Sequence, residues 1–411
     1  MRKLFFVILL TVLIGCSGQT ENEFRSEDHI SSIDSLIQKE IEANHIPGAV
    51  IQVKKGDSIL HRAAYGHAEK YDFDLQLLDD PGPMKTDYLF DLASLTKVTA
   101  TTFGIILLVD QDKLGLDDLI GNYLPEFSEG KKSAITIRHL LTHSAGLAQW
   151  VPTYYHAENP QERYEYIAQL PLKWKKVGQE RHYSDLGFML LADIIERISG
   201  QRLDQYLQEK LYQPLNLQHT TFNPLEKRCK KITATSHGNP FEKRMVYDDE
   251  FGYTVDEEPE SWDGWREYTL YGEVNDGNAW YANGGIAGHA GLFSNINDLQ
   301  VLVDLLIEGG EANGEQIISK SVIDTFLTKD KFDNGLGWAM DKNFIKAEGS
   351  PDGTFGHTGF TGTNIVVVPQ DSLSIILLTN RQHVGPGENG YYFDLGPLRQ
   401  AIFDIVWQNK K

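Results

Sequence analysis

Segments with the pattern of β-strands lie at both ends of this chain, and helical segments fill the middle. Apolar and β-branched residues recur in strand-like fashion at residues 49–54, 58–65, 336–340, 363–368 and 373–379. Short turns separate neighbouring segments, such as Lys-Gly-Asp after the first and Pro-Gln-Asp before the last. One sheet assembled from both ends of the chain, with a helical lobe inserted between them, is the simplest arrangement.

Helical spacing of apolar residues marks residues 30–45, 95–110, 136–142, 162–169, 185–199, 203–212 and 397–408. The segment 95–110 is apolar on nearly all sides, which predicts a buried central helix. Two segments look irregular, 71–86 and 240–280. The second is acidic and aromatic and has the features of a long surface loop.

A chain of 411 residues is too long for one core of ordinary size. We expect an α+β fold in which an antiparallel sheet flanked by helices carries an inserted all-helical lobe. Residues 30–110 and 281–411 would form the α/β lobe, and residues 111–280 the mostly helical lobe. The active site would lie between the two lobes, where clefts commonly form.

Residues 1–15 have the features of an export signal. Two basic residues precede an apolar run at 4–14, which rises only about 16 Å as a helix and is too short to span a membrane. Residues 13–16 (LIGC) resemble the bacterial lipobox, which implies cleavage before Cys16 and lipid attachment to its sulfur. Residues 16–29 would be a polar tether. The predicted location is a bacterial cell-envelope membrane, in the periplasm or at the outer surface; a plain signal peptide cleaved nearby is the alternative.

The formal net charge is −20, from 38 basic and 58 acidic residues. A surface this acidic disfavours nucleic acid and anionic lipid headgroups as partners. The two cysteines are Cys16 and Cys229, and because Cys16 belongs to the leader we expect no intrachain disulfide. The sequence has no nucleotide-binding loop and no set of residues at metal-ligand spacing, so we expect neither a cofactor nor a metal.

Ser94 and Lys97 fit the pattern S-x-x-K at the start of the apolar segment 95–110. The positive end of a helix dipole favours an alkoxide on Ser94. Lys97 lies on the same helix face, and a lysine desolvated in a cleft can accept a proton. A helix cap with Lys97 in solvent is the alternative, but a lysine in so apolar a helix must lie in core or cleft. A second match, Ser128 to Lys131, contains glycine and is interpreted as a loop.

Tyr183, Ser184 and Asp185 precede the next apolar helix, so a loop presents them at a helix start. A tyrosine there could transfer protons. The alternative is a buried aromatic residue before an aspartate that caps the helix.

His357, Thr358 and Gly359 lie in a glycine-rich stretch directly before the strand at 363–368. His357 would place a cationic or hydrogen-bonding group beside a cleft, and the glycines would let a substrate backbone approach. The alternative is a glycine-rich hairpin with an incidental histidine.

Together the three motifs resemble S-x-x-K, Y-x-N and [KH]-T-G of serine β-lactamases and penicillin-binding proteins. Flanking segments agree at 90–97 (FDLASLTK), 138–146 (RHLLTHSAG), 284–293 (GGIAGHAGLF) and 356–362 (GHTGFTG). The resemblance runs from about residue 30 to the end of the chain and is to the branch of class C β-lactamases, DD-peptidases and esterases. It implies the β-lactamase/transpeptidase-like fold.

The resemblance also implies a role for each motif residue. Ser94 would attack a carbonyl group and form an acyl-enzyme, and Lys97 and Tyr183 would share the work of general base and general acid. The backbone N–H groups of Ser94 and Phe360 would form the oxyanion hole. The remaining motif residues would contact the substrate: Asp185, His357, Thr358 and Gly359.

Two residues depart from the family pattern. Asp185 stands where the family's asparagine would donate to a substrate amide, whereas a carboxylate only accepts and repels anionic substrates. His357 replaces the lysine common in true β-lactamases, and histidine is usually neutral near pH 7. Efficient β-lactam hydrolysis is therefore not expected.

The predicted function is a serine hydrolase, of carboxypeptidase or esterase type, that acts on a small-molecule or cell-wall peptide substrate: a peptidoglycan-type D-amino-acid peptide, a β-lactam or a small ester. The alternative is a non-catalytic protein that keeps the fold to bind a cell-wall peptide or a partner. Intact Ser94, Lys97 and Tyr183 favour the enzyme, because a degenerate copy tends to lose one of them.

Seven further residues are of interest but belong to none of the three motifs. His143 and His289 are interpreted as packing or loop histidines, and Gln149 and Trp150 as pocket candidates. The aromatic residues at 262, 265 and 271 either cover the cleft or pack the lobe; they are Trp262, Trp265 and Tyr271.

Overall fold

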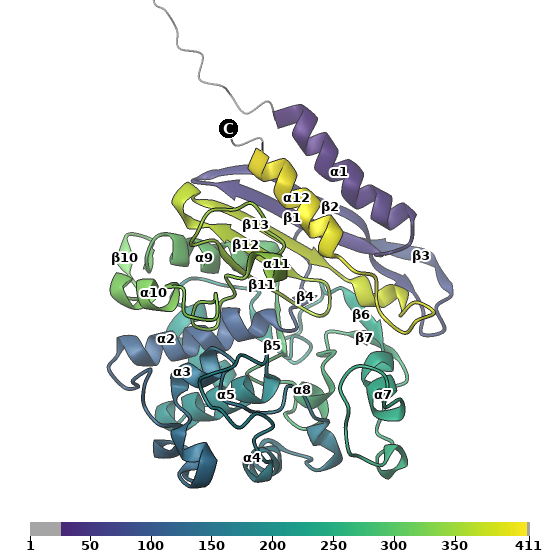
Figure 1. Ribbon diagram of the computed structural model, residues 1–411. Coiled ribbons are helices and arrows are strands. Elements are labelled where there is room, and N and C mark those ends of the chain that lie inside the picture. The colour runs from purple at the N-terminus through teal and green to yellow at the C-terminus, as the bar shows by residue number, and fades with distance from the viewer. Residues whose placement is uncertain (1–25, 409–411) are drawn as a thin grey trace, which may run out of the picture.

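The computed structural model describes residues 26–408, with side chains from residue 31 onward. Its frame is an antiparallel six-stranded sheet in the order β11-β12-β13-β1-β2-β3 (Figure 1). The strands come from both ends of the chain: β1 (Gly48–Lys55), β2 (Ser58–Tyr71), β3 (Leu77–Pro83), β11 (Phe355–Thr358), β12 (Asn364–Val368) and β13 (Leu373–Thr379). The two ends meet where β1 pairs with β13, with Ile51 opposite Leu377. The predicted α+β fold and the sheet shared by both ends are confirmed.

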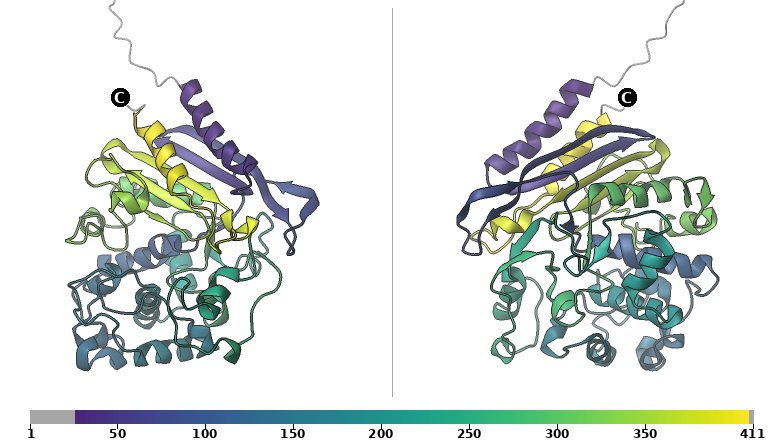
Figure 2. Two further views of the ribbon diagram at one scale, coloured as in Figure 1. Left: turned by 45° about the vertical axis from the view of Figure 1, so that its right-hand side comes forward. Right: turned by 180° about the vertical axis from the view of Figure 1, so that it is seen from behind.

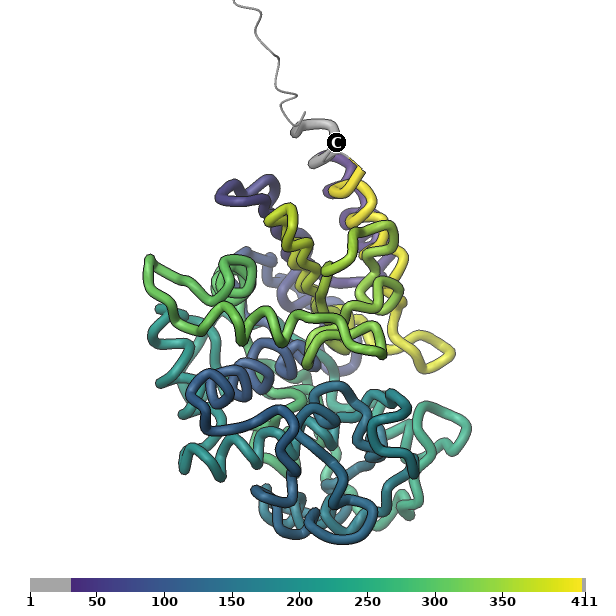
Figure 3. Tube along the Cα trace, turned by 60° about the vertical axis from the view of Figure 1, so that its left-hand side comes forward, coloured from purple at the N-terminus to yellow at the C-terminus, as the bar shows by residue number. Residues whose placement is uncertain are grey.

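The two faces of the sheet are covered by different helices, as the view from behind in Figure 2 also shows. α1 (Ser26–Glu42) and α12 (Gly396–Gln408) lie side by side on one face (Figure 3), and α9 (Ile296–Ile307) lies under the other. Along β1, Ile51 packs in the apolar cluster of α1 and α12, whereas Val50 belongs to the main core on the opposite side. This is the alternation expected of a strand with both faces buried.

The main core surrounds the helix that begins at Leu95. The helix contains a π-helical turn (Lys97–Thr101) and continues as α2 (Thr102–Asp110). Residues 95–108 are all buried, which confirms the predicted central helix. π-helical turns are often found at functional sites, and this one begins at Lys97.

The part of the chain below the sheet in Figure 1 is mostly helical but not all-helical as predicted, because residues 111–280 also contain short strands. Its helices include α3 (Ile137–Leu141), α4 (Pro160–Gln169), α5 (Asp185–Ser199) and α6 (Leu203–Leu207), with a π-helical turn (Gln208–Tyr212) after α6. Short ladders join β4 (Phe90–Asp91), β8 (Leu292–Ser294) and β5 (Thr221–Phe222), then β6 (Ala234–His237) with β7 (Thr269–Tyr271), and β9 (Glu311–Ala312) with β10 (Glu315–Gln316). The remaining helices are α7 (Pro240–Tyr247), α8 (Gly277–Tyr281), α10 (Lys320–Phe326) and α11 (Lys342–Ile345).

The prediction that residues 71–86 are irregular is wrong, because β3 forms an edge of the sheet. Its sequence, LLDDPGP, is poor in residues that favour strands. An edge strand tolerates proline because one side of its backbone pairs with no neighbour. The pairing is sparse, with Tyr71 opposite Leu77 and His67 opposite Pro83.

Two further predictions of local structure are wrong. Residues 240–280 are more than a surface loop, since they contain α7, β7 and the start of α8. Pro240 at the first position of α7 is a helix-start signal that the acidic and aromatic composition obscured. Residues 336–340 are not a strand: Ala339 makes only isolated bridges, to Asn334 and Gly356, and Gly337 turns the chain with a φ of 79°.

Within residues 26–408, no helix combines the length and the apolar character needed to cross a membrane. The predicted signal peptide, Cys16 and the first part of the predicted tether lie outside the described residues. α1 begins at Ser26 rather than at residue 30. The residue boundaries of the two lobes stay a prediction.

Candidate active site

Ser94 lies in a tight turn between β4 and the central helix. Ala93 adopts a left-handed φ of 45°, a conformation that costs energy for alanine and is often found at functional sites. The buried carboxyl of Asp91 holds the turn, because its oxygens accept the N–H of Ala93 at 2.9 Å and the N–H of Asn275 at 2.6 Å. The turn is therefore held in part by Asn275, which is far away in sequence. This turn places Ser94 beside Lys97.

Lys97 is buried, and three oxygen atoms besides the hydroxyl of Tyr183 surround its Nζ. They are Ser94 Oγ at 3.0 Å, the carbonyl of His289 at 3.2 Å and Asp185 Oδ1 at 2.7 Å. Each proton of an ammonium group thus has an acceptor within reach. Burial by itself would lower the pKa of Lys97, but Asp185 and Tyr183 raise it above its ordinary value. Lys97 is held as a cation in this arrangement.

Tyr183 completes the group around Ser94. Its ring centroid lies 4.9 Å from Lys97 Nζ, and its hydroxyl is hydrogen-bonded to Lys97 and Ser94. Burial raises the pKa of Tyr183, and Lys97 opposes that rise only in part. His143 stacks on the tyrosine at 4.4 Å between centroids, and its Nδ1 accepts the N–H of Ser184 at 3.0 Å. His143 therefore holds the tyrosine loop, in agreement with its interpretation as a packing and loop residue.

Asp185 is the first residue of α5, which begins where Ser184 Oγ accepts the N–H of Gly187 at 3.3 Å. The family resemblance assigned this carboxylate to the substrate. The structure places Asp185 in the wall of the active-site cavity and also in an ion pair with Lys97. Sequence reasoning did not foresee that pair, because it joins two helices whose relative placement only the fold sets.

His357 lies at the end of β11 and is only 2% exposed. Its Nδ1–H donates to the carbonyl of Thr358 at 2.8 Å, which leaves Nε2 as an acceptor in a neutral ring. Burial, with the nearby positive charges of Lys97 and Arg181, lowers the pKa of His357 to about 3. Of the two sequence options, the structure supports a hydrogen-bonding group and contradicts a cationic one. The ring centroid lies 6.1 Å from that of Tyr183.

The loop after His357 is tied to the turn that carries Ser94. The hydroxyl of Thr361 donates to the carbonyl of Asp91 at 2.7 Å. A side chain at Gly359 would come within 2.4 Å of the carbonyl oxygen of Leu92, so only glycine allows this close approach. Within the described residues, the N–H groups of Ser94 and Phe360 donate to no protein acceptor.

A cavity of about 360 Å³ opens in front of Ser94. Its wall consists of Ala93, Ser94, Trp150, Tyr183, Asp185, Phe241, Glu242, Met245, Gly252, Tyr253, Asn275, Asp276, Ala290 and Phe360. Four predicted site residues line it, together with Trp150. Lys97 and His357 are buried beside it, and Thr358 and Gly359 belong to the adjoining strand end and loop.

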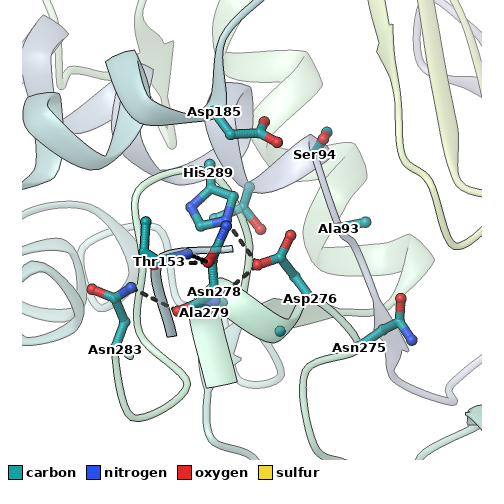
Figure 4. A network of polar contacts seen from close by, with 12 residues as sticks. Ala93, Ser94, Thr153, Asp185, Asn275, Asp276, Asn278, Ala279, Asn283 and His289 are labelled. Carbon is teal, nitrogen blue, oxygen red and sulfur yellow. Dashed lines mark hydrogen bonds and ion pairs between the residues drawn. The ribbon is translucent and has the colours of Figure 1, made fainter. Parts of the chain in front are cut away.

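Sequence reasoning missed three polar residues of this wall: Glu242, Asn275 and Asp276. The dense polar run at 275–278 (NDGN) was a usable signal for the last two, and no local signal distinguishes Glu242. Figure 4 shows His289 donating to Asp276, at 2.8 Å, close to Asp185 and Ser94. His289 is thus a loop histidine that fixes a carboxylate of the cavity.

The pKa values of Glu242 and Asp276 are shifted in opposite directions. Burial, reinforced by the nearby charge of Asp276, raises the pKa of Glu242 to about 8. Burial would raise the pKa of Asp276 as well, but His289 outweighs it and lowers that pKa below its ordinary value. Near neutral pH, Asp276 is ionised and Glu242 largely keeps its proton.

Several other residues singled out in the sequence do not line the cavity. Ser128 and Lys131 are exposed; Ser128 lies in a bend, as the loop interpretation predicted, whereas Lys131 lies in a short 3₁₀ helix (Gly130–Ala134). Trp262 packs against Trp265, with 4.9 Å between ring centroids, so of the two options for these residues the structure supports packing. Cys229 is a free, partly buried thiol.

Known proteins resemble the chain along most of its length. The family profile described as Beta-lactamase matches residues 33–395. An N-acetylmuramyl-L-alanine amidase of Bacillus subtilis is 34% identical over 391 residues, which cover 90% of this chain and 85% of that protein. A provisionally named D-alanyl-D-alanine carboxypeptidase of Escherichia coli K12 is 33% identical over 404 residues, which cover 92% of this chain and 89% of that protein.

Solved structures share the fold at low sequence identity. EstCE1, a hydrolase with promiscuous acyltransferase activity, superposes with a TM-score of 0.67 at 20% identity and covers 94% of this chain and 100% of its own. A class C β-lactamase from Rhodobacter sphaeroides superposes with a TM-score of 0.66 at 18% identity and covers 93% of this chain and 100% of its own. The profile match and the two relatives show that this chain belongs to the Beta-lactamase family, whose members are generally serine hydrolases.

Proposed function

We propose that this protein cleaves an amide bond in a fragment of the bacterial cell wall, through an acyl-enzyme on Ser94. The observation that carries the proposal is the 3.0 Å contact between Lys97 Nζ and Ser94 Oγ in front of a cavity of about 360 Å³. The names of the two relatives, an amidase and a carboxypeptidase, support an amide of cell-wall origin.

Ser94 Oγ attacks the carbonyl carbon, and its proton passes to the pair formed by Lys97 and Tyr183. The N–H groups of Ser94 and Phe360 donate to the oxyanion that forms. The same pair then protonates the leaving amine as the C–N bond breaks, which leaves the acyl group on Oγ. Water attacks this ester and gives a proton to the pair, and the pair passes that proton to Ser94 Oγ as the bond between the carbonyl carbon and Oγ breaks. The products are the acid and the free Ser94 hydroxyl.

The surroundings of Lys97 and Tyr183 set the pH dependence of this reaction. Both groups have a raised pKa, so near neutral pH the pair holds both of its protons. The form that accepts a proton from Ser94 lacks one of them, and the two groups titrate as a unit. We therefore expect kcat/KM to rise with pH across the neutral range.

The charges around the cavity disfavour β-lactams. The carboxylate of a β-lactam needs a positive or donating partner, whereas Asp185 is an acid and His357 is neutral. Neutral amides and esters avoid this conflict, so we expect them to react faster than β-lactams.

A substrate panel tests the proposal. The purified protein is incubated with a muramyl-L-alanine amide, an acyl-D-Ala-D-Ala peptide, a p-nitrophenyl ester and nitrocefin. We expect cleavage of at least one cell-wall amide, slower turnover of nitrocefin, and loss of both activities in Ser94→Ala. Tight binding of the amides with no hydrolysis of any substrate would contradict the proposal and favour a binding protein.

We also propose that the chain is exported and anchored by a lipid on Cys16. The lipobox-like residues 13–16 support this location, as do the cell-wall names of the relatives. Labelled palmitate should be incorporated by the full chain in the producing bacterium and not by Cys16→Ala. Equal labelling of both forms would contradict the anchor.

A further inference from the structure

The cavity in front of Ser94 combines acidic groups with an aromatic wall. Every charged side chain that lines it is acidic: Asp185, Glu242 and Asp276. Four aromatic residues besides Tyr183 complete the wall: Trp150, Phe241, Tyr253 and Phe360. The rings of Phe241 and Phe360 lie 5.0 Å apart, edge to face, so this part of the wall is continuous.

Only one of the three acids is neutralised by a lysine or arginine in direct contact. Asp185 pairs with Lys97 at 2.7 Å, whereas Asp276 contacts His289 at 2.8 Å and its charge raises the pKa of the neighbouring Glu242. Gly277 allows this approach, because a side chain there would come within 2.2 Å of Glu242 Oε2. The N–H of Gly277 donates to Glu242 Oε1 at 2.8 Å and fixes the carboxyl in place.

Two adjacent carboxyl groups at a cavity wall are complementary to a positive charge. Like charges close together keep one of the pair protonated, and a cation between them would let both ionise. Aromatic faces attract an ammonium group through the negative charge of the ring. The acidic surface of the whole chain, with a formal net charge of −20, also attracts cations.

We propose that this cavity binds a protonated amine in the acyl part of the substrate, against the carboxyl groups of Glu242 and Asp276 and the aromatic wall. The inference rests on the proposed acyl-enzyme. The acyl part is the part expected there, because it stays bonded to Ser94 Oγ, which itself lines the cavity.

Three p-nitrophenyl esters of equal length test the inference in the unmodified protein: 6-aminohexanoate, heptanoate and 6-hydroxyhexanoate. They differ only in a terminal ammonium, methyl or hydroxyl group. At pH 8 we expect kcat/KM for the amine to exceed that for each neutral ester by at least about tenfold, because the amine is charged there. Equal values for the amine and either neutral ester would overturn the inference.

A variant pair assigns the preference to the cavity. Glu242→Gln keeps an acceptor for the N–H of Gly277 but cannot ionise, so the ratio of amine to methyl ester should fall at least about threefold. Glu315→Gln removes an exposed acid on β10 and should keep the ratio. An unchanged ratio in Glu242→Gln, or an equal fall in both variants, would overturn the assignment.

The pH dependence supplies a signature that packing alone would not give. Burial and Asp276 raise the pKa of Glu242 to about 8, so the preference for the amine should grow as pH rises from 7 to 9 and Glu242 ionises. The titratable and charged groups that face Glu242 are Asp276, Arg266, Tyr154, Tyr281 and Tyr392. A preference that does not change over this range would contradict the role of Glu242.

The outcomes separate this inference from the function on which it rests. If Ser94→Ala still hydrolyses the esters, the acyl-enzyme on Ser94 is refuted. That result would not by itself refute binding of the amine in the cavity. Ser94-dependent hydrolysis with no preference among the three esters would refute only the amine site. A preference that follows the amine when it is moved to the leaving group would refute its assignment to the acyl part.

Discussion

The two ends of the cavity carry opposite electrostatic arrangements. At the Ser94 end, Lys97 and Asp185 lie 2.7 Å apart and neutralise each other. At the other end, which also lies close to Ser94, Glu242 and Asp276 place two acids next to each other, and Glu242 largely keeps its proton near neutral pH. The first end therefore holds a proton that is available for chemistry. At the second end Asp276 contacts His289 at 2.8 Å, and among the described residues no lysine or arginine is in direct contact with either acid.

The largest effect should come from the nucleophile, since it defines the catalytic end. Ser94→Ala removes the atom that carries the acyl group, and turnover of esters and amides should fall about 10²–10⁶-fold. The matched control is Ser128→Ala, the serine of the exposed S-x-x-K match, which should keep full activity. An equal loss of turnover in both variants, or no loss in Ser94→Ala, would contradict the assignment of Ser94 as the nucleophile of the catalytic end.

The next effect concerns proton transfer. Tyr183→Phe keeps the ring that stacks on His143 but removes the hydroxyl bonded to Ser94 and Lys97, so kcat should fall about 10²–10⁴-fold. Tyr123→Phe, a tyrosine bonded to Asp118 far from the cavity, should be near wild type. A change in KM alone would show that Tyr183 binds substrate and does not move the proton.

A pH profile tests the ion pair at the catalytic end. Asp185 raises the pKa of Lys97, so Asp185→Asn should lower that pKa, because burial then acts unopposed by this carboxylate. The basic form of the pair would be populated at lower pH. The acidic limb of kcat/KM against pH should move down by about 1–3 pH units. A limb that stays in place would show that Asp185 does not control the proton on Lys97.

The smallest effect is on the free energy of unfolding and concerns Glu242, at the second end of the cavity. The folded pKa of Glu242, about 8, lies above its unfolded value, so the folded state binds the proton more tightly. This contribution is fully present below about pH 4, declines as the pH rises and is lost above the folded pKa. The free energy of unfolding of the wild type should therefore fall relative to that of Glu242→Gln between about pH 5 and 8 in urea titrations. Parallel curves for the two proteins would contradict the raised pKa.

The sequence predicted the parts of the molecule that depend on local pattern. The period-two segments at both ends predicted the shared sheet, and the apolar run after Ser94 predicted a buried helix with Lys97 inside the fold. Motif spacing also selected Tyr183, which lies beside Ser94.

The parts that depend on long-range packing could not be predicted in this way. Glu242 reaches the cavity because the N–H of Gly277, 35 residues away, holds its carboxyl, and nothing near Glu242 in sequence indicates this. β3 forms a strand against its own composition because β2 offers it an edge. The cationic option for His357 failed because its burial and the charges of Lys97 and Arg181 arise only in the folded chain.

The most direct test of the central claim is to trap the covalent intermediate. The protein is quenched in acid during turnover of a slow ester or amide, digested and analysed by mass spectrometry. We predict that the acyl mass lies on the peptide containing residues 90–97, on Ser94, and that it is absent from Ser94→Ala. An acyl group on another residue, or turnover with no acylated peptide under conditions that trap the acyl-enzyme of a known serine hydrolase, would contradict it.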